Sequence, residues 1–294
     1  MMYLSALSAQ EKNQERKTVI YETIHMNKIY DFLGENGCDP TLRLYLPLNL
    51  PEMGRQNQKR PCIVVCPGGG YSSCSEREGE PIALKFLSAG YNVFILNYSC
   101  APNRFPTQLR EVAAVMDLIH HHSEDWNSDP ERIAIIGFSA GGHLAAHYST
   151  SYDCQQVREV FPNSRPVKAS ILCYPVITAE ENISHRDSFV NLTGEEVMDQ
   201  DFIDRFSCDR LVTDKTPPAF IWHTAEDDGV PVQNSLLYAR ALADHKIPFA
   251  LHVYPFGPHG LATSDGETND NMNEKTELTS TWVTDAVKWL KLFV

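Results

Sequence analysis

Short runs of apolar and β-branched residues recur along the chain, and each run is bounded by polar, glycine or proline residues. Runs of this length and composition are typical of β-strands rather than helices. The pattern predicts eight strands, at residues 18–24, 42–47, 62–66, 91–99, 132–137, 168–175, 219–224 and 249–255.

Between the later strands, apolar residues recur every three or four positions, which indicates amphipathic helices. One helix is expected from Glu80 to a C-cap at Gly90, a second follows residue 142, and a third covers residues 234–245. Two more are marked by apolar residues on one face, namely Leu109, Val112, Ala113, Met116 and Ile119, and then Trp282, Ala286, Trp289, Leu290 and Phe293.

The alternation of strands and helices predicts an α/β fold with an eight-stranded, mostly parallel sheet and helices on both faces. The first two strands are joined by a short link, so we expect them to pair antiparallel at the edge. We expect one domain over residues 1–294, with residues 178–218 as a small cap or lid inserted between two strands. The polar residues 264–275 are expected to form a loop.

The net charge and the apolar pattern argue against some classes of partner and location. A net charge of -13 argues against nucleic acid or an anionic membrane as partner, because both require clustered Lys and Arg. The first twenty residues do not have the pattern of a secretion signal, and no later apolar run is long enough to span a bilayer. We therefore expect a cytoplasmic protein. A homo-oligomer is compatible with the sequence.

Cysteine usage agrees with a reducing compartment. The chain has eight cysteines, none in a CxxC pair, and Cys62, Cys66 and Cys173 lie inside predicted strands. This placement favours buried, reduced thiols over disulfides.

The segment Gly137-Phe138-Ser139-Ala140-Gly141 places a serine where a strand ends and a helix begins. The pattern G-x-S-x-G in this context is typical of an exposed nucleophile held on a strained turn. The pentapeptide alone is weak evidence for a nucleophile, because a packing turn whose serine has no catalytic role can have the same sequence pattern. Its position between a strand and a helix favours the catalytic interpretation.

A serine hydroxyl needs a base to take its proton and a carboxylate to orient that base. In a site of this kind the acid and then the histidine follow the serine, each after a strand. Glu226, Asp227 and Asp228 follow the seventh predicted strand, and His259 follows the eighth. The residues alone do not separate the three acids.

Other histidines fit structural roles better. His143 and His147 are one helical turn apart, a spacing that could bind zinc, but no glutamate lies between them and no third ligand is evident. The run from His120 to His122 points in different directions along a helix end. We predict no metal and no organic cofactor.

A serine attack also needs N–H donors for the negative oxygen that it creates. The glycine-rich segment Cys66–Tyr71 follows the third strand, and the amide of Ala140 follows the nucleophile. Both positions can supply such donors. A phosphate-binding loop is not indicated, because no Lys-Ser or Lys-Thr follows the glycines.

Five segments taken together resemble a known family. They are "VCPGGGY", "EGEPIALKFLSAGYNVFILNYS", "GFSAGGHLAA", "TPPAFIWHTAEDDGVPVQNSLLYARAL" and "HVYPFGPHGLA", within residues 42–262. The chain is similar to the α/β-hydrolase serine esterases that act on hemicellulose, the acetyl xylan esterases and the bifunctional acetyl xylan/feruloyl esterases.

The resemblance implies roles for individual residues. It implies Ser139 as nucleophile, His259 as base, and Asp227 as the acid, because Asp227 begins a D-x-x-V-P frame. It also implies an oxyanion hole made by Ala140 and two glycines of the third-strand loop. Many lipase-type relatives begin that loop with His-Gly-Gly-Gly where this chain has Cys-Pro-Gly-Gly-Gly, and we favour Gly69 and Gly70 as the donors.

The implied reaction is deacetylation of small acetylated xylo-oligosaccharides through an acyl-serine intermediate. General short-chain carboxylesterase and feruloyl esterase activities are alternatives, followed by a prolyl-oligopeptidase-like peptidase and a non-catalytic binding protein. Tyr71, Phe105 and Tyr174 follow strands toward the same sheet edge and are candidate substrate contacts, with core packing as the alternative for each.

Overall fold

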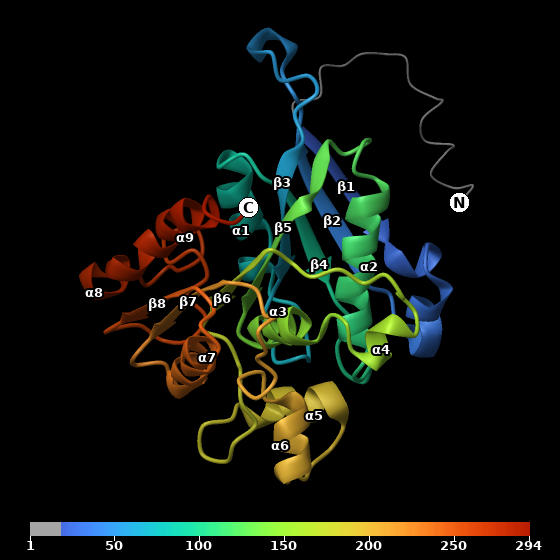
Figure 1. Ribbon diagram of the computed structural model, residues 1–294. Coiled ribbons are helices and arrows are strands. Elements are labelled where there is room, and N and C mark those ends of the chain that lie inside the picture. The colour runs from blue at the N-terminus through green and yellow to red at the C-terminus, as the bar shows by residue number, and fades with distance from the viewer. Residues whose placement is uncertain (1–18) are drawn as a thin grey trace.

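The computed structural model describes residues 19–294, which build one eight-stranded sheet with helices on both sides. The strands are β1 (Val19–His25), β2 (Thr41–Pro47), β3 (Arg60–Cys66), β4 (Asn92–Asn97), β5 (Ser128–Phe138), β6 (Ala169–Cys173), β7 (Ala219–Thr224) and β8 (Phe249–Tyr254). Across the sheet their order is β1-β2-β4-β3-β5-β6-β7-β8 (Figure 1). The strands from β4 to β8 in this order pair in parallel, and β2 pairs antiparallel with both β1 and β4. The predicted sheet and its antiparallel edge pair are confirmed.

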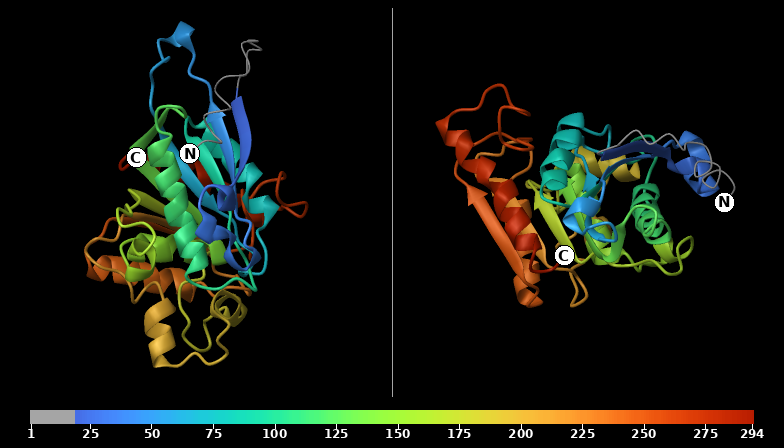
Figure 2. Two further views of the ribbon diagram at one scale, coloured as in Figure 1. Left: turned by 90° about the vertical axis from the view of Figure 1, so that its right-hand side faces the viewer. Right: turned by 90° about the horizontal axis from the view of Figure 1, so that it is seen from above.

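Nine α-helices occur in this part of the chain, and the predicted helices all fall among them. They are α1 (Glu80–Ser88), α2 (Thr107–His121), α3 (Ala140–Ser151), α4 (Gln155–Arg158), α5 (Arg186–Thr193), α6 (Gln200–Phe206), α7 (Gln233–Asp244), α8 (Glu274–Glu277) and α9 (Trp282–Leu290). Apolar residues of α1 and α9 pack on one face of the sheet, and those of α2, α3 and α7 pack on the other (Figures 1 and 2).

Strand β3 is apolar at successive positions because both of its faces are buried. Ile63 and Val65 belong to the core under α1 and α9, whereas Val64 and Cys66 belong to the core under α2 and α3. Successive side chains of a strand point to opposite faces, so a sheet covered on both faces buries all of them.

The three cysteines that lie in strands are buried thiols. Cys62, Cys66 and Cys173 form no disulfide, as the sequence predicts. Burial raises the pKa of the Cys62 thiol to about 12, which keeps it protonated and unreactive.

The segment 178–218, predicted as a cap, contains α5 and α6, which project below the sheet in Figure 1. The side-chain amide of Asn191 in α5 donates to the carbonyl of Gly70, and the amide of Phe105 donates to the carbonyl of Leu192. These contacts place the segment at the carboxyl ends of the parallel strands, over the glycine-rich loop.

Within residues 19–294, no helix is long and apolar enough to cross a membrane. The expectation about a secretion signal concerns the first twenty residues, and residues 1–18 lie outside the described part of the chain.

A buried acid lies beneath the loop that follows β4. Glu111 of α2 is fully buried, and one of its carboxylate oxygens accepts a hydrogen bond from the amide of Ser99 at 2.8 Å. Its other oxygen, Oε1, has no hydrogen-bond partner. Burial raises the pKa of Glu111 to about 7, because the charged form loses its hydration.

This raised pKa predicts that Glu111 lowers the free energy of unfolding as the pH rises from about 4.5, the usual pKa of a glutamate, to about 7. In this range the unfolded chain has released the proton and the folded chain retains it, so raising the pH favours unfolding. Relative to Glu111→Gln, the free energy of unfolding of the wild type should fall by about 3 kcal/mol at most across this window. Urea unfolding at pH 5 and pH 8 measures it.

The exposed residue Glu52 provides the control for this experiment, as Glu52→Gln removes a carboxylate without any change in burial. A difference between wild type and Glu111→Gln that stays constant with pH would contradict the prediction.

Candidate active site

Ser139 lies at a sharp bend between β5 and α3. Its backbone has φ 53° and ψ -119°, a conformation that non-glycine residues rarely adopt and that the surrounding structure must hold in place. The amide of Ser139 donates to the carbonyl of Cys173 at 3.0 Å, which fixes the bend against β6. The bend presents the hydroxyl at the carboxyl end of the central strands.

The glycines on either side of Ser139 are required by close backbone contacts. A Cβ atom on Gly141 would lie 2.1 Å from the carbonyl oxygen of Cys66 and 2.3 Å from that of Pro67. A Cβ atom on Gly137 would lie 2.1 Å from the carbonyl oxygen of Gly141. Neither position has room for a side chain.

His259 links the serine to an acid. Its Nε2 lies 2.8 Å from Oγ of Ser139, and its Nδ1 lies 2.7 Å from Oδ2 of Asp227. A carboxylate can only accept, so Nδ1 carries the proton and Nε2 is free to accept the serine proton. The structure thus joins the three predicted residues, which are far apart in sequence, in one line of hydrogen bonds.

The three candidate acids after β7 differ in burial. Asp227 is 7% exposed and bonds to His259, whereas Glu226 and Asp228 are exposed. Glu226 instead accepts from the amide of Gly257 at 3.3 Å. Only Asp227 among the three contacts the histidine.

The carboxylate of Asp227 is held on both oxygens. Oδ1 accepts from the amides of Gly229 and Val230 at 3.0 and 2.8 Å. Burial by itself would raise the pKa of Asp227, but hydrogen bonds from His223, His259 and Val230 hold that pKa far below its usual range. Asp227 therefore stays ionised at neutral pH.

His223 is a second partner of Asp227 that the sequence did not reveal. It is fully buried in β7, and its Nε2 donates to the carbonyl of Val230 at 2.8 Å and toward Asp227 Oδ2 at 3.2 Å. Its Nδ1 accepts from the hydroxyl of Ser235 at 2.7 Å. Its place inside a strand removed it from the candidate bases, and no local pattern marks it as a support for the acid.

Glu78 is a second residue that sequence reasoning missed. This carboxylate is 3% exposed, and its two oxygens accept from the hydroxyl of Tyr174 at 2.7 Å and from the amide of Gly68 at 2.8 Å. The Tyr174 hydroxyl in turn accepts from the amide of Ala262 at 2.9 Å, in the loop that carries His259. Burial raises the pKa of Glu78, while these two hydrogen bonds oppose the rise.

The glycine-rich loop after β3 turns directly beside Ser139. Gly69 and Gly70 have φ of 130° and 63°, which favours glycine at both positions. The amide of Gly68 is already bonded to Glu78, so it is not free to bind a substrate oxygen. The roles of Gly69, Gly70 and Ala140 as oxyanion donors stay a prediction.

Two of the three candidate substrate contacts are corrected by the structure. Tyr71 is 1% exposed, with its hydroxyl bonded to His143 Nδ1 at 2.9 Å, and Tyr174 is 2% exposed beneath His259. Both residues have positive φ, 57° and 36°, so the backbone turns their rings into the core instead of toward the sheet edge. Neither ring has a face available to a sugar.

Phe105 also packs within the protein. Its ring stacks on His147 of α3 at 5.6 Å and meets Phe206 of α6 edge-on at 5.2 Å. It is half-buried between α3 and the cap segment, and it does not line the pocket beside His259.

The histidine pair on α3 serves packing. Nδ1 of His143 bonds to Tyr71, and Nε2 bonds to the carbonyl of Phe206 at 2.8 Å, so neither nitrogen is free to bind a metal. Burial lowers the pKa of His143 to about 4 and that of His147 to about 3, which keeps both rings neutral. Across residues 19–294 no group of three or more metal-ligating side chains is found.

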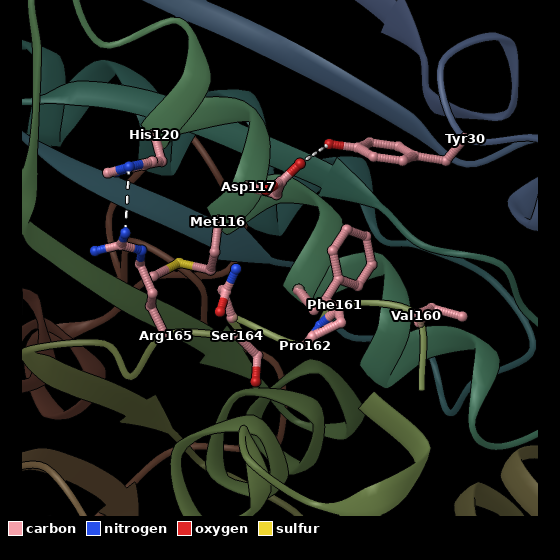
Figure 3. A pocket seen from close by; sticks show the side chains of 11 residues that line it. Tyr30, Met116, Asp117, His120, Val160, Phe161, Pro162, Ser164 and Arg165 are labelled. Carbon is pink, nitrogen blue, oxygen red and sulfur yellow. Dashed lines mark hydrogen bonds between the residues drawn. The ribbon is translucent and has the colours of Figure 1, made fainter. Parts of the chain in front are cut away.

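Two of the pockets in the described part of the chain differ in whether predicted site residues line them. A pocket of about 450 Å³ borders His259 and is otherwise lined mainly by polar side chains. A second pocket of about 250 Å³ lies between α2 and the loop that follows α4, and contains none of the predicted site residues (Figure 3). In it Tyr30 donates to Asp117 at 2.5 Å, and Arg165 lies 3.3 Å from His120. The pocket that borders His259 is therefore the one next to the candidate active site.

Comparisons with known proteins agree on the kind of protein. A family model described as BD-FAE matches residues 46–242. The chain is 36% identical over 256 residues to endo-1,4-beta-xylanase B of Butyrivibrio fibrisolvens, covering 84% of this chain and 38% of that protein. It is 33% identical over 226 residues to an acetylxylan esterase of Xylanibacter ruminicola, covering 73% of this chain and 45% of that protein. The chain thus spans less than half the length of these two relatives.

Solved structures of ester hydrolases resemble this chain over nearly its whole length. An acetyl ester-xyloside bifunctional hydrolase from Caldicellulosiruptor lactoaceticus superposes with a TM-score of 0.77 at 35% identity, covering 92% of this chain and 96% of that one. The carboxylesterase Cest-2923 from Lactobacillus plantarum has a TM-score of 0.77 at 28% identity, covering 94% and 98%. These likenesses confirm the predicted α/β-hydrolase fold.

The crowding at Gly141 gives a prediction for stability. Gly141→Ala should destabilise the protein by about 3 kcal/mol, the upper end of the usual cost of overpacking, because two carbonyl oxygens must move. Thermal and urea unfolding measure this loss. Gly266→Ala is the matched control, because a Cβ atom there meets no heavy atom within 4 Å. Equal unfolding midpoints for the two variants would contradict the prediction.

Proposed function

Because the chain belongs to the BD-FAE family, we propose that it is a serine-type carboxylic ester hydrolase that removes acetyl groups from xylo-oligosaccharides. The observation that carries the proposal is the hydrogen-bonded line Ser139–His259–Asp227 beside a polar pocket. The acyl group and the sugar are supported by the names of two relatives, an acetylxylan esterase and an acetyl ester-xyloside hydrolase.

The first half of the reaction acylates the serine. Nε2 of His259 accepts the hydroxyl proton while Oγ of Ser139 attacks the acetyl carbonyl carbon. The imidazolium that forms is stabilised by the ionised carboxylate of Asp227. His259 then donates the proton to the sugar oxygen as its bond to the acyl carbon breaks, and the sugar leaves.

The second half uses the same groups on water. His259 takes a proton from a water molecule, the water oxygen attacks the acyl carbon, and the bond to Ser139 Oγ breaks as His259 returns the proton. Acetate is released. In both halves the negative oxygen would be held by the amides of Gly69 or Gly70 and of Ala140, since Glu78 occupies the amide of Gly68.

The substrates are small esters in this proposal, and the site of action is the cytoplasm. Buried cysteines without disulfides, such as Cys62 and Cys173, support a reducing compartment. A polymer does not enter the cytoplasm, so acetylated oligosaccharides are the form in which xylan would reach this protein.

The choice of Asp227 as the orienting acid can be tested against its neighbour. Asp227→Asn should lower kcat for 4-nitrophenyl acetate by about three to four powers of ten, because the amide cannot hold the correct tautomer of His259. Asp228→Asn should change kcat less than about twofold, because that carboxylate is exposed. Similar losses in both variants would exclude Asp227 as the specific orienter.

The substrate class is tested by initial rates on three esters, with Ser139→Ala as the blank. Acetylated xylobiose should be hydrolysed with the highest kcat/KM, ahead of methyl ferulate and an octanoyl ester. A blank without activity assigns the rate to Ser139. Faster hydrolysis of methyl ferulate or of the octanoyl ester would support a feruloyl esterase or a general carboxylesterase instead.

A further inference from the structure

The pocket beside His259 is placed on one particular side of the reacting bond. His259 Nε2 must lie within hydrogen-bond reach of the oxygen that leaves, because it is the group that protonates this oxygen. The acyl oxygen, by contrast, must face the amide donors next to Ser139. A pocket that borders His259 is therefore on the side of the alcohol half of the ester.

The lining of this pocket suits a sugar. Arg77, Asn269, Asp270 and Asn271 supply hydrogen-bond donors and acceptors, and Pro258 and Met272 supply apolar surface. The volume of about 450 Å³ lies within the range of about 300–1,000 Å³ that is usual for small-molecule sites. Polar groups for hydroxyls together with apolar surface for C–H groups match the two kinds of surface on a pyranose ring.

Arg77 is the donor that is available. Its side chain is exposed and forms no hydrogen bond or salt bridge to the described part of the chain. One of its guanidinium nitrogens lies 3.2 Å from the point that a Cβ atom on Gly260 would occupy, directly after His259 in the sequence. The guanidinium group therefore lies next to the reacting centre, and its donors form no bond to the described part of the chain.

The opposite wall is anchored rather than loose. The side-chain amide of Asn269 donates to the carbonyl of Leu261 at 2.7 Å, and the Thr268 hydroxyl lies 3.3 Å from the same oxygen. Beyond Met272, Asn273 caps α8 by accepting from the amides of Lys275 and Thr276. Asp270 and Asn271 lie between these two anchored ends.

The charges favour a neutral ligand. Arg77 and Asp270 carry opposite charges, and the resting tautomer of His259 is neutral, so the lining has almost no net charge. The carboxylate of a uronic acid would be repelled by Asp270, and a cationic group would be repelled by Arg77. A polyhydroxylated neutral unit can bond to both.

We propose that this pocket is the subsite for the leaving sugar, a neutral pentose unit, and that Arg77 donates hydrogen bonds to its hydroxyl oxygens. The assignment rests on the proposed function, because it names the alcohol half of the ester that Ser139 attacks. Arg77 determines specificity in this assignment and takes no part in proton transfer.

The test compares two acetyl esters that differ only in the leaving group, acetylated xylobiose and 4-nitrophenyl acetate. In Arg77→Ala the ratio of kcat/KM for the sugar ester to that for the aryl ester should fall about tenfold or more, mainly through KM. Arg240→Ala, a change at an exposed arginine of α7, should leave the ratio unchanged. An unchanged ratio in Arg77→Ala overturns the proposal.

Unmodified xylobiose supplies a second measurement that does not depend on cleavage of a sugar ester. It should inhibit hydrolysis of 4-nitrophenyl acetate competitively, with an inhibition constant about tenfold higher in Arg77→Ala and in Asn271→Ala. If the wild type cleaves only the aryl ester, the proposed function fails, and inhibition by xylobiose still decides the subsite. No competitive inhibition of the wild type overturns it.

Discussion

The contact between the bend at Ser139 and the end of β3 determines the arrangement of the other site residues. Gly141 approaches the carbonyls of Cys66 and Pro67 so closely that no side chain fits between them. This contact fixes the first turn of α3, and hence the amide of Ala140, against the loop that carries Gly69 and Gly70. Ser139 and the predicted oxyanion donors are thus positioned by the backbone, before any side chain of the site contributes.

Three buried acids near the sheet are stabilised in different ways. Asp227 accepts hydrogen bonds on both oxygens and remains ionised. Glu78 accepts one hydrogen bond on each oxygen, and Glu111 has an oxygen with no partner. The number of donors decreases in this order, and burial raises the pKa of the last two. Of the three acids, only Asp227 has enough donors to hold its pKa below the usual range.

The sequence predicted the sheet, the helices on its two faces and the three residues of the hydrogen-bonded line, because these depend on local patterns and on fixed positions after strands. The resemblance to acetyl xylan esterases, which rested on ordered motifs, is confirmed by the family match. Tyr71 and Tyr174 were misplaced because a position after a strand does not reveal a positive φ, which turns both rings inward. Glu78 was missed because its partner Tyr174 is distant in sequence. His223 was missed because it lies within a strand, where no periodicity marks it.

The hydroxyl group of Tyr174 has a consequence for motion at the site. It bonds to Glu78 and to the amide of Ala262, so a single group connects the loops that follow β3, β6 and β8. Displacement of any one loop stretches a buried hydrogen bond to another, and their thermal fluctuations are therefore correlated.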